Sequence, residues 1–453
     1  MKSLFLQLQK NGSISTESID WKAANQRLQE RRDPAGLERM TEAERAVWLE
    51  QQLAQLGLES AALDADISAI QQLSSIAASL ESLGDAVVNM MEADDANPEN
   101  IERMAQLATT ISSPADDTPI RLTNNEGVVS TESLSGRVKS VFVAIIAGIK
   151  RLINEVGQLL VRFRSLSGNL RRQLKNAQNG LRQYRSVGTL EFVPTVAMSA
   201  LTDADGEFDS QDALVTMRRL VEQFTWCANV LAPETTTFIV EMSKWLAGLD
   251  LTSDESLVKT FEGITTVKLP QAPSSWKALS GAQRGFKETR SELTFTNHAF
   301  TAVSVDGPTK DAVDTLDRAV MNGVIEYDFV DGKTVVANDD VITVHSVSDI
   351  SEMITLALNL LDLQDALQEH TTKMTKELNG LMTAGQWLMD AASKAEQLDD
   401  SSVAKVVLAI QAPQSVALRV HSPFRAVLYE TTRVITGVAS LATKAKTALD
   451  SAE

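Results

Sequence analysis

The sequence of 453 residues is poor in cysteine and in long apolar runs. Cys227 stands alone, so no disulfide can form within the chain. The longest strongly apolar run, Val141 to Ile149, has nine residues, whereas a helix needs about 20 to span a bilayer. The opening stretch MKSLFLQLQKNG has no apolar core of signal-peptide length. These absences exclude a disulfide-stapled scaffold and predict a chain without a stable membrane span.

Residues from which metal and catalytic sites are built are also scarce. The four histidines are His298, His345, His370 and His421. None lies three to five residues from another histidine or from the cysteine, which is the spacing that zinc sites use. No glycine-rich phosphate loop occurs.

One acidic stretch, LTDADGEFDSQD, has calcium-loop spacing at Asp203, Asp205 and Gly206. Its first ligand would be Leu201 and its last Asp212, where a calcium loop needs a carboxylate and a bidentate glutamate. We interpret this stretch as a solvated acidic turn. We therefore expect no metal, no cofactor and no catalytic residue, and we do not expect an enzyme.

Two long stretches nearly lack charge of one sign. No Lys or Arg occurs from Ala46 to Glu102, and residues 133–187 hold a single acid, Glu155. Residues 1–132 carry 22 Asp/Glu and 10 Lys/Arg (net −12), residues 133–187 carry 1 and 11 (net +10), and residues 188–453 carry 37 and 21 (net −16). The total of −18 argues against general nucleic-acid binding, but this uneven distribution is the better guide to partners.

A heptad pattern of apolar residues runs through the basic stretch. Its seam recurs in steps of four and three at Val138, Phe142, Ile145, Ile149, Leu152, Val156, Leu159, Phe163, Leu166 and Leu170. A four-residue stutter then leads to Leu174, Ala177 and Leu181. The pattern predicts a long amphipathic helix with coiled-coil-like packing, which begins at Ser133 or Ser135 as N-cap. Because four glycines interrupt it at about 1 kcal/mol each, packing must stabilise this helix.

The sequence after Val187 is mixed. DALVTMRRLVEQFTWCANVLA and ETTTFIVEMSKWLAGL predict two helices separated by Pro233. ELTFTNHAFTAVSVDGP and GVIEYDFVDGKTVVANDDVITVHSV alternate at period two, with a hairpin signal at Asp331–Gly332. TKDAVDTLDRAVMN predicts a short helix between these strands, and from Ser348 the pattern is helical again.

These patterns predict a mainly α protein, a long-helix bundle with a small α+β insert built on an antiparallel sheet. The chain is too long for one ordinary core. The predicted divisions are an acidic helical segment at 1–110, a linker at 111–132, the basic long helix and following helices at 133–263, the α+β insert at 264–347, and the C-terminal helices at 348–453.

The basic face of the long helix allows three interpretations. Its Lys and Arg residues are solvated or paired with the acidic body, or they contact a polyanion such as double-stranded DNA through phosphates, or the helix lies on a membrane. The charge bias and the heptad packing favour the first two. The candidate DNA contacts are Arg162, Arg164, Arg171, Arg172 and Lys175.

The charge changes sign at a Ser-x-Glu motif, Ser130-Thr131-Glu132, which ends a linker with two prolines. Ser-x-Glu occurs five times in the chain, so the motif alone decides little, and it also serves as a helix start. Its position matters more, because a protease needs an exposed and extended peptide. Cleavage between Glu132 and Ser133 would remove net −12 as a propeptide and leave a chain of about −6.

This layout resembles the internal head proteins of giant phiKZ-like tailed phages. The resemblance rests on VVSTES ahead of LSGRVKSVFVAIIAGIKRLINEVGQLL, on the acidic N-terminal segment and on the long helical body. It implies a bacteriophage structural protein that is made in the host cytoplasm and packed inside the capsid with DNA and other internal head proteins. It also implies a substrate of the phage prohead protease, cut after Glu132.

An alternative is an unprocessed helical structural or interaction protein. Such a protein would oligomerise through the heptad seam of residues 138–170. A mature N-terminus at Ser133 would favour the first interpretation, and Met1 would favour the second.

Overall fold

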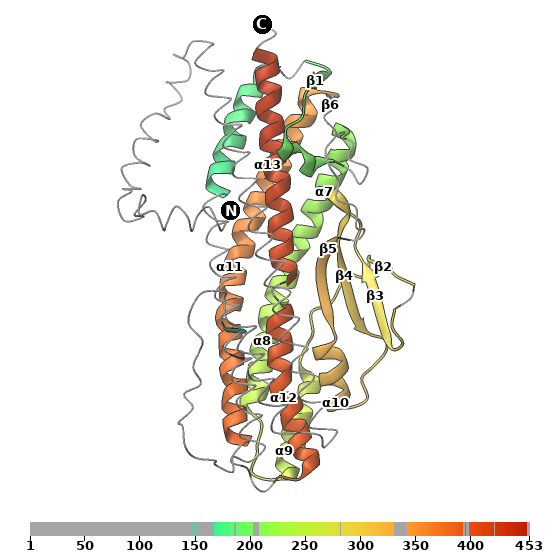
Figure 1. Ribbon diagram of the computed structural model, residues 1–453, viewed down its shortest axis with the longest axis vertical. Coiled ribbons are helices and arrows are strands. Elements are labelled where there is room, and N and C mark those ends of the chain that lie inside the picture. The colour runs from blue at the N-terminus through green and yellow to red at the C-terminus, as the bar shows by residue number, and fades with distance from the viewer. Residues whose placement is uncertain are drawn as a thin grey trace, which may run out of the picture. The chain divides into compact units, whose positions relative to one another are not determined.

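The computed structural model describes residues 146, 149–150, 167–184, 187–202, 208–280, 282–329, 342–392, 395, 398–420 and 422–450. These residues form a bundle of long helices with an antiparallel sheet on one side (Figure 1). The predicted fold class, mainly α with a small antiparallel sheet, is confirmed. Among the residues described, no helix is long and apolar enough to cross a membrane.

Besides the helix at 167–181, the described part of the bundle contains four long helical segments and a shorter one. They are α7 (Ser210–Trp226) with α8 (Ala232–Ala247), α9 (Asp254–Phe261), α11 (Val347–Ala392), α12 (Asp400–Arg419) and α13 (Ser422–Asp450). Short 3-10 segments connect them at η2 (Val196–Leu201) and η4 (Glu262–Thr266).

Helices α7 and α8 are not separated at Pro233, where the sequence pattern predicts a break. A π-helical turn, η3 (Cys227–Leu231), joins the two helices directly. Pro233 falls in the first turn of α8, directly after this π-turn, in which the Ala232 N–H bonds to the carbonyl of Cys227, five residues back. The two predicted helices are therefore present as α7 and α8, but the boundary between them is a π-turn and not a break at Pro233.

The basic helix is described at 167–181 and ends in a 3-10 turn, η1 (Arg182–Tyr184). Its seam residues are buried here: Leu170, Leu174 and Leu181 are 0% exposed. Side-chain hydrogen bonds tie this helix to α11 in antiparallel order, from Lys150 to Gln386, Ser167 to Asp365 and Gln178 to Thr355. Ile149 is also buried, whereas Phe142 and Phe163 lie outside the described residues.

The sheet contains β2 (Lys277–Ala278), β3 (Phe286–Arg290), β4 (His298–Val305) and β5 (Val324–Phe329), antiparallel and in that order. A one-turn helix α10 (Ala312–Asp314) and a π-helix η6 (Thr315–Met321) link β4 to β5, as the short helical pattern predicts. Gly285 and Gly307 both have φ of +88°, and both lie at the end of the β3–β4 pairing where Phe286 pairs with Val305.

The last predicted strand is described only at its end. This part, β6 (Ile342–Val344), pairs antiparallel with β1 (Leu190–Phe192). The hairpin signal at Asp331–Gly332 lies outside the described residues. The alternating pattern identified a strand but could not identify its partner, which is about 150 residues away in sequence.

Helix α13 packs against α11, η2 and the sheet. None of its described residues is exposed, and its buried residues include several threonines and one guanidinium, Arg425, whose pKa burial lowers to about 10. The buried amide of Gln364 on α11 donates from Nε2 to the hydroxyls of Thr431 (2.7 Å) and Thr432 (2.9 Å). This polar contact fixes α11 against α13, because a shift along either helix would leave buried polar atoms unpaired.

The sheet packs on the helices through an aromatic cluster that includes Trp226 of α7 and through a buried carboxylate of α13. Phe300 is fully buried between the rings of Trp226, Trp276 and Tyr327. Beside them, Glu430 of α13 is 1% exposed, and its Oε2 lies 3.9 Å from His298 Nδ1 with no hydrogen-bond partner among the described residues. Burial raises the Glu430 pKa, against the opposing charges of His298 and Arg433.

Gly437 gives a test of the close packing around α13. A Cβ there would lie 3.0 Å from the carbonyl oxygen of Ala197 and 3.0 Å from Cγ of Leu201, both in η2. We expect Gly437→Val to lower the free energy of unfolding by about 1–3 kcal/mol through overpacking. The control is Gly380→Ala on α11, where nothing lies within 4 Å of the new methyl group. It should raise stability by about 0.5–1 kcal/mol. Chemical denaturation measures both, and equal effects would contradict this packing.

Glu430 gives a second test, through pH. Since its pKa is raised in the folded state, the folded chain binds a proton at Glu430 more tightly than the unfolded chain. The free energy of unfolding therefore falls as the pH rises above 4.5, the ordinary pKa of a glutamate. Glu430→Gln removes this loss. The stability of the variant relative to the native chain should therefore increase from pH 4 to pH 7. A flat difference between Glu430→Gln and the native chain would contradict the assignment.

Candidate functional surfaces

The cleavage motif predicted from the sequence lies outside the described residues, which leaves Ser130, Thr131, Glu132 and Ser133 without a structural account. Another copy of the motif, Ser253-Asp254-Glu255, is described. Ser253 is the N-cap of α9, and its hydroxyl accepts a hydrogen bond from the Ser256 amide at 3.2 Å. Asp254 accepts one from the Asp399 amide at 3.0 Å. This copy is therefore a helix start that is held against the α11–α12 connection.

Three of the five candidate DNA contacts are described. Arg171 forms ion pairs with Asp362 and Asp365 of α11, the second at 2.8 Å. Partial burial lowers the Arg171 pKa, but these bonds outweigh that effect and the pKa is raised overall. Arg172 and Lys175 are exposed on the same helix, and Arg162 and Arg164 lie outside the described residues. Arg171 therefore pairs with the acidic body, whereas its two neighbours present their charges to solvent.

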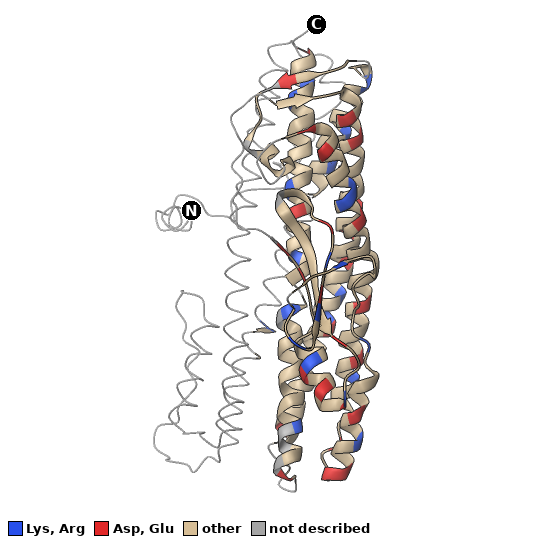
Figure 2. Cartoon of the chain, turned by 90° about the vertical axis from the view of Figure 1, so that its right-hand side faces the viewer, with Lys and Arg blue, Asp and Glu red and all other residues tan. Residues whose placement is uncertain are grey.

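Among the described residues, the face that carries the sheet shows no extended patch of one charge sign. Figure 2 shows Lys and Arg interspersed with Asp and Glu along the helices and strands on this face. Some of these charges are paired, for example Arg218 with Glu352 and Arg219 with Glu292. A phosphate backbone needs a concentrated positive field, so this face is not suited to bind DNA.

The described histidines serve structural contacts. His345 Nε2 lies 2.8 Å from Oδ2 of Asp209, the N-cap of α7. His298 stacks on Tyr327 next to Glu430, and His370 is half-buried on α11. His421 lies outside the described residues. Within the described part of the chain, no three His, Cys, Asp or Glu residues are grouped in a way that could hold a metal ion.

The acidic stretch at 201–212 is only partly described. Leu201, at the first loop position, is buried in η2, and Asp212 lies exposed in the first turn of α7. Asp203, Asp205 and Gly206 lie outside the described residues. The lone thiol, Cys227, is fully buried in η3, and burial raises its pKa far above the usual value. A thiol in this state is a poor nucleophile.

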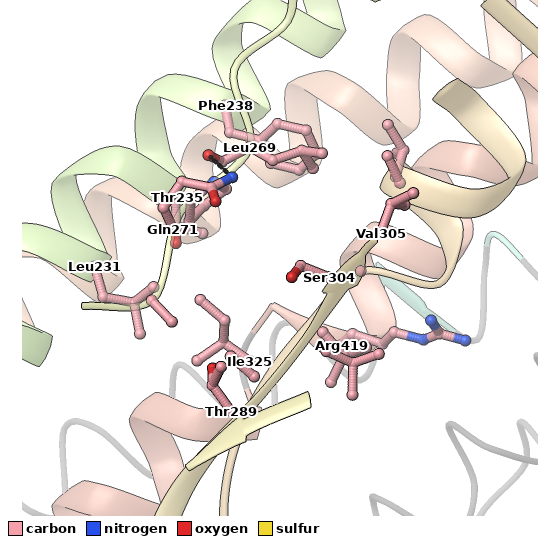
Figure 3. A pocket seen from close by; sticks show the side chains of 18 of the residues that line it. Leu231, Thr235, Phe238, Leu269, Gln271, Thr289, Ser304, Val305, Ile325 and Arg419 are labelled. Carbon is pink, nitrogen blue, oxygen red and sulfur yellow. Dashed lines mark hydrogen bonds between the residues drawn. The ribbon is translucent and has the colours of Figure 1, made fainter. Parts of the chain in front are cut away.

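A cavity of about 650 Å³ lies between the sheet and the helices (Figure 3). One wall comes from Leu231, Thr235 and Phe238 around the start of α8 and from the loop that contains Leu269 and Gln271. The sheet supplies the opposite wall, with Thr289, Ser304 and Ile325 among its residues. The sequence pattern did not reveal this cavity. Its one signal is that the side chains facing the helices become small along β4, from Phe300 to Ala302 and Ser304.

The chemistry of this cavity does not suit catalysis. Lys287 and Arg419 are the charged side chains among the described residues that line it. Arg419 donates to the carbonyl oxygen of Met321, and in Figure 3 its guanidinium points away from the hollow. A general acid–base pair or an activated nucleophile needs two groups within hydrogen-bonding reach of each other, and these lining residues provide neither.

The comparison with protein families gives a match over most of the chain. Residues 49–444 match the family of phiKZ-like phage internal head proteins. Searches of curated proteins and of solved structures find no match. The match includes the basic helix, the sheet and all the described helices of the bundle except the last residues of α13. The resemblance drawn from the sequence is thereby confirmed, and the chain belongs to the phiKZ-like phage internal head proteins, structural components that lie inside the capsid of the virion.

Proposed function

We propose that this internal head protein is made with an acidic N-terminal segment that the phage prohead protease removes after Glu132. Residues 1–110 form the segment and residues 111–132 the linker that is cut. Residues 133–453 then remain in the head, where they pack with other internal head proteins and contact double-stranded DNA without sequence preference. In this body, the helices of 133–263 and 348–453 form the bundle, and the α+β insert of 264–347 packs on one side of it.

The charge distribution is the observation that carries this proposal. The net charge changes from −12 over residues 1–132 to +10 over residues 133–187, and Ser130-Thr131-Glu132 stands at that boundary. Removal of the first segment takes the net charge of the chain from −18 to about −6. An interior that fills with DNA repels a less acidic protein less strongly.

The described Ser-x-Glu copy supports the choice of site. Ser253-Asp254-Glu255 is fixed in a helix start by hydrogen bonds to Ser256 and Asp399. A protease that binds an extended peptide would have to unfold α9 to reach Glu255. The copy at 130–132 follows a stretch with two prolines and little periodicity, which is typical of a linker.

The structure limits how much of the basic stretch can contact DNA. Arg171 already holds two carboxylates of α11, so it has less charge to offer a phosphate. Arg172 and Lys175 are exposed one residue and four residues further along the helix. The proposed contact therefore uses Arg172 and Lys175, together with Arg162 and Arg164, as phosphate ligands.

The alternative function, oligomerisation through the seam of residues 138–170, is disfavoured by burial. Ile149 and Leu170 are both 0% exposed within the chain. Seam residues that pack inside one chain have no free face for a second chain, and this applies to the part of the seam that is described.

Processing can be tested on protein isolated from virions. We expect mass spectrometry of its N-terminal peptide to give Ser133, because cleavage after Glu132 is the proposed maturation step. Glu132→Ala should leave an unprocessed chain in the particle. Glu255→Ala is the matched control, since it changes the same motif within the folded α9, and its processing should be unchanged. A native N-terminus at Met1 would contradict the proposal.

The DNA contact can be tested by anisotropy titration with double-stranded DNA at several salt concentrations. A chain that begins at Ser133 should bind more tightly than the full chain, because the acidic segment is absent. Each phosphate neutralised contributes about −0.9 to the salt slope. Reversal of Arg172 and Lys175 to Glu should therefore reduce the slope by about 2. Reversal of Arg171 should reduce it less. Equally negligible binding by both chains would refute the contact.

A further inference from the structure

The cavity beneath the sheet lies where the side chains of β4 become small. One row across the strands, Phe300 with Tyr327, is filled by aromatic rings, because Trp226 and Trp276 pack on Phe300. The next two rows toward the end of β4 line the cavity with smaller side chains: Thr289, Ala302 and Ile325, followed by Lys287 and Ser304. The resulting volume of about 650 Å³ is in the range of small-molecule sites.

The opposite wall is one face of α8 and of the turn before it. Leu231, Thr235 and Phe238 are spaced by four and three residues, so they lie on the same side of this helix, and each is at most 4% exposed. Phe424 of α13 and Trp276 also line the cavity. Because burial of one methylene group tightens binding by about fourfold, walls of this composition favour a ligand with an apolar chain.

Thr235 is a buried polar side chain in this wall. It is 4% exposed, and its hydroxyl forms no hydrogen bond within the described part of the chain. The next residue of α8, Thr236, instead donates to the carbonyl oxygen of Ala232 at 2.9 Å. A buried hydroxyl without a partner is costly, so Thr235 marks a position for a polar group of a ligand. In Figure 3, Thr235 lies across the hollow from Ser304.

The charged side chains of the lining are positive. Lys287 stands opposite Ser304 in the β3–β4 pairing, and its ammonium group forms no ion pair with any described residue. Arg419 is the second cation, and no carboxylate is among the described residues that line the cavity. Glu288 alternates with Lys287 to the other face of β3, and Asp306, two residues after Ser304, is exposed and outside the lining. The Lys287 ammonium group is therefore left for an anionic group of a ligand.

We propose that the cavity binds a medium-chain carboxylate, in a role separate from the proposed processing and DNA contact. The carboxylate lies between Lys287, Ser304 and Thr235, which supply an ammonium group and two hydroxyl donors. The alkyl chain lies over Ala302 and ends at the aromatic rings around Phe300. The four residues from Ser304 back to Phe300 span about 13 Å of strand, which is the length of an extended chain of about ten carbon atoms.

Titration calorimetry of the full chain with octanoate and decanoate, below the concentrations at which they form micelles, tests this proposal. We expect one saturable site, which binds decanoate roughly 15-fold more tightly than octanoate because two methylene groups are added. Lys287→Met should weaken decanoate binding about fivefold, through loss of an exposed ion pair. Thr235→Val should weaken it by about the same factor, through loss of a hydrogen bond. The matched control is Lys277→Met, at an exposed lysine of β2 outside the lining, which should leave binding unchanged.

A second pair of variants fills the hollow. Ala302→Leu places a larger side chain in the cavity and should weaken decanoate binding at least tenfold. Thr301→Leu places the same side chain on the other face of β4 and should not weaken it. Absence of saturable binding by the native chain overturns the proposal, and so do equal affinities of the two leucine variants or of the two lysine variants. Thermal unfolding shows whether each variant is folded, and Ser304→Leu, at an exposed position of the lining, replaces Ala302→Leu if the latter does not fold.

Discussion

The enclosure of α13 by the rest of the bundle is the constraint on which the other contacts depend. The amide of Gln364 fixes α11 against it, η2 approaches it closely at Gly437, and β5 of the sheet packs on it near Glu430. A helix that is covered on nearly every side must satisfy its own polar side chains. Its threonines do so by donating hydrogen bonds one turn back, as Thr431 does to Val427 and Thr436 to Thr432.

The sequence could predict the elements that follow a local pattern, but not the contacts between distant segments. Local patterns were sufficient for α11, whose apolar positions repeat over 46 residues, and for β4 and β5, which alternate and pair with each other. Pairings between distant segments could not be predicted from the sequence. The pairing of β6 with β1 is an example, because about 150 residues separate the two strands. Pro233 gave a false break because the π-turn at Cys227–Leu231 carries the chain past it. A π-turn depends on tertiary packing, which leaves no clear pattern in one sequence.

The features of the candidate function that could be predicted from the sequence are the charge distribution and the order of the segments along the chain. The boundary at Glu132 and the basic stretch are visible in the sequence because net charge needs no structure. The partner of Arg171 was not visible, since Asp362 and Asp365 lie almost 200 residues away. The cavity beneath the sheet was also missed. It depends on which face of β4 turns toward the helices, and a one-residue shift in register would reverse that face.

The position of α13 in the sequence also bears on how the protein folds. It follows every other described element, so the helix at 167–181, α7, α8 and α11 all leave the ribosome before it does. At about 5–20 residues per second, the roughly 240 residues between that first helix and α13 take on the order of 10–50 s to synthesise. For that period the apolar faces that α13 covers, on α11 among others, lack their partner. The bundle must therefore close late and from distant segments, which favours slow folding and a need for protection from aggregation during synthesis.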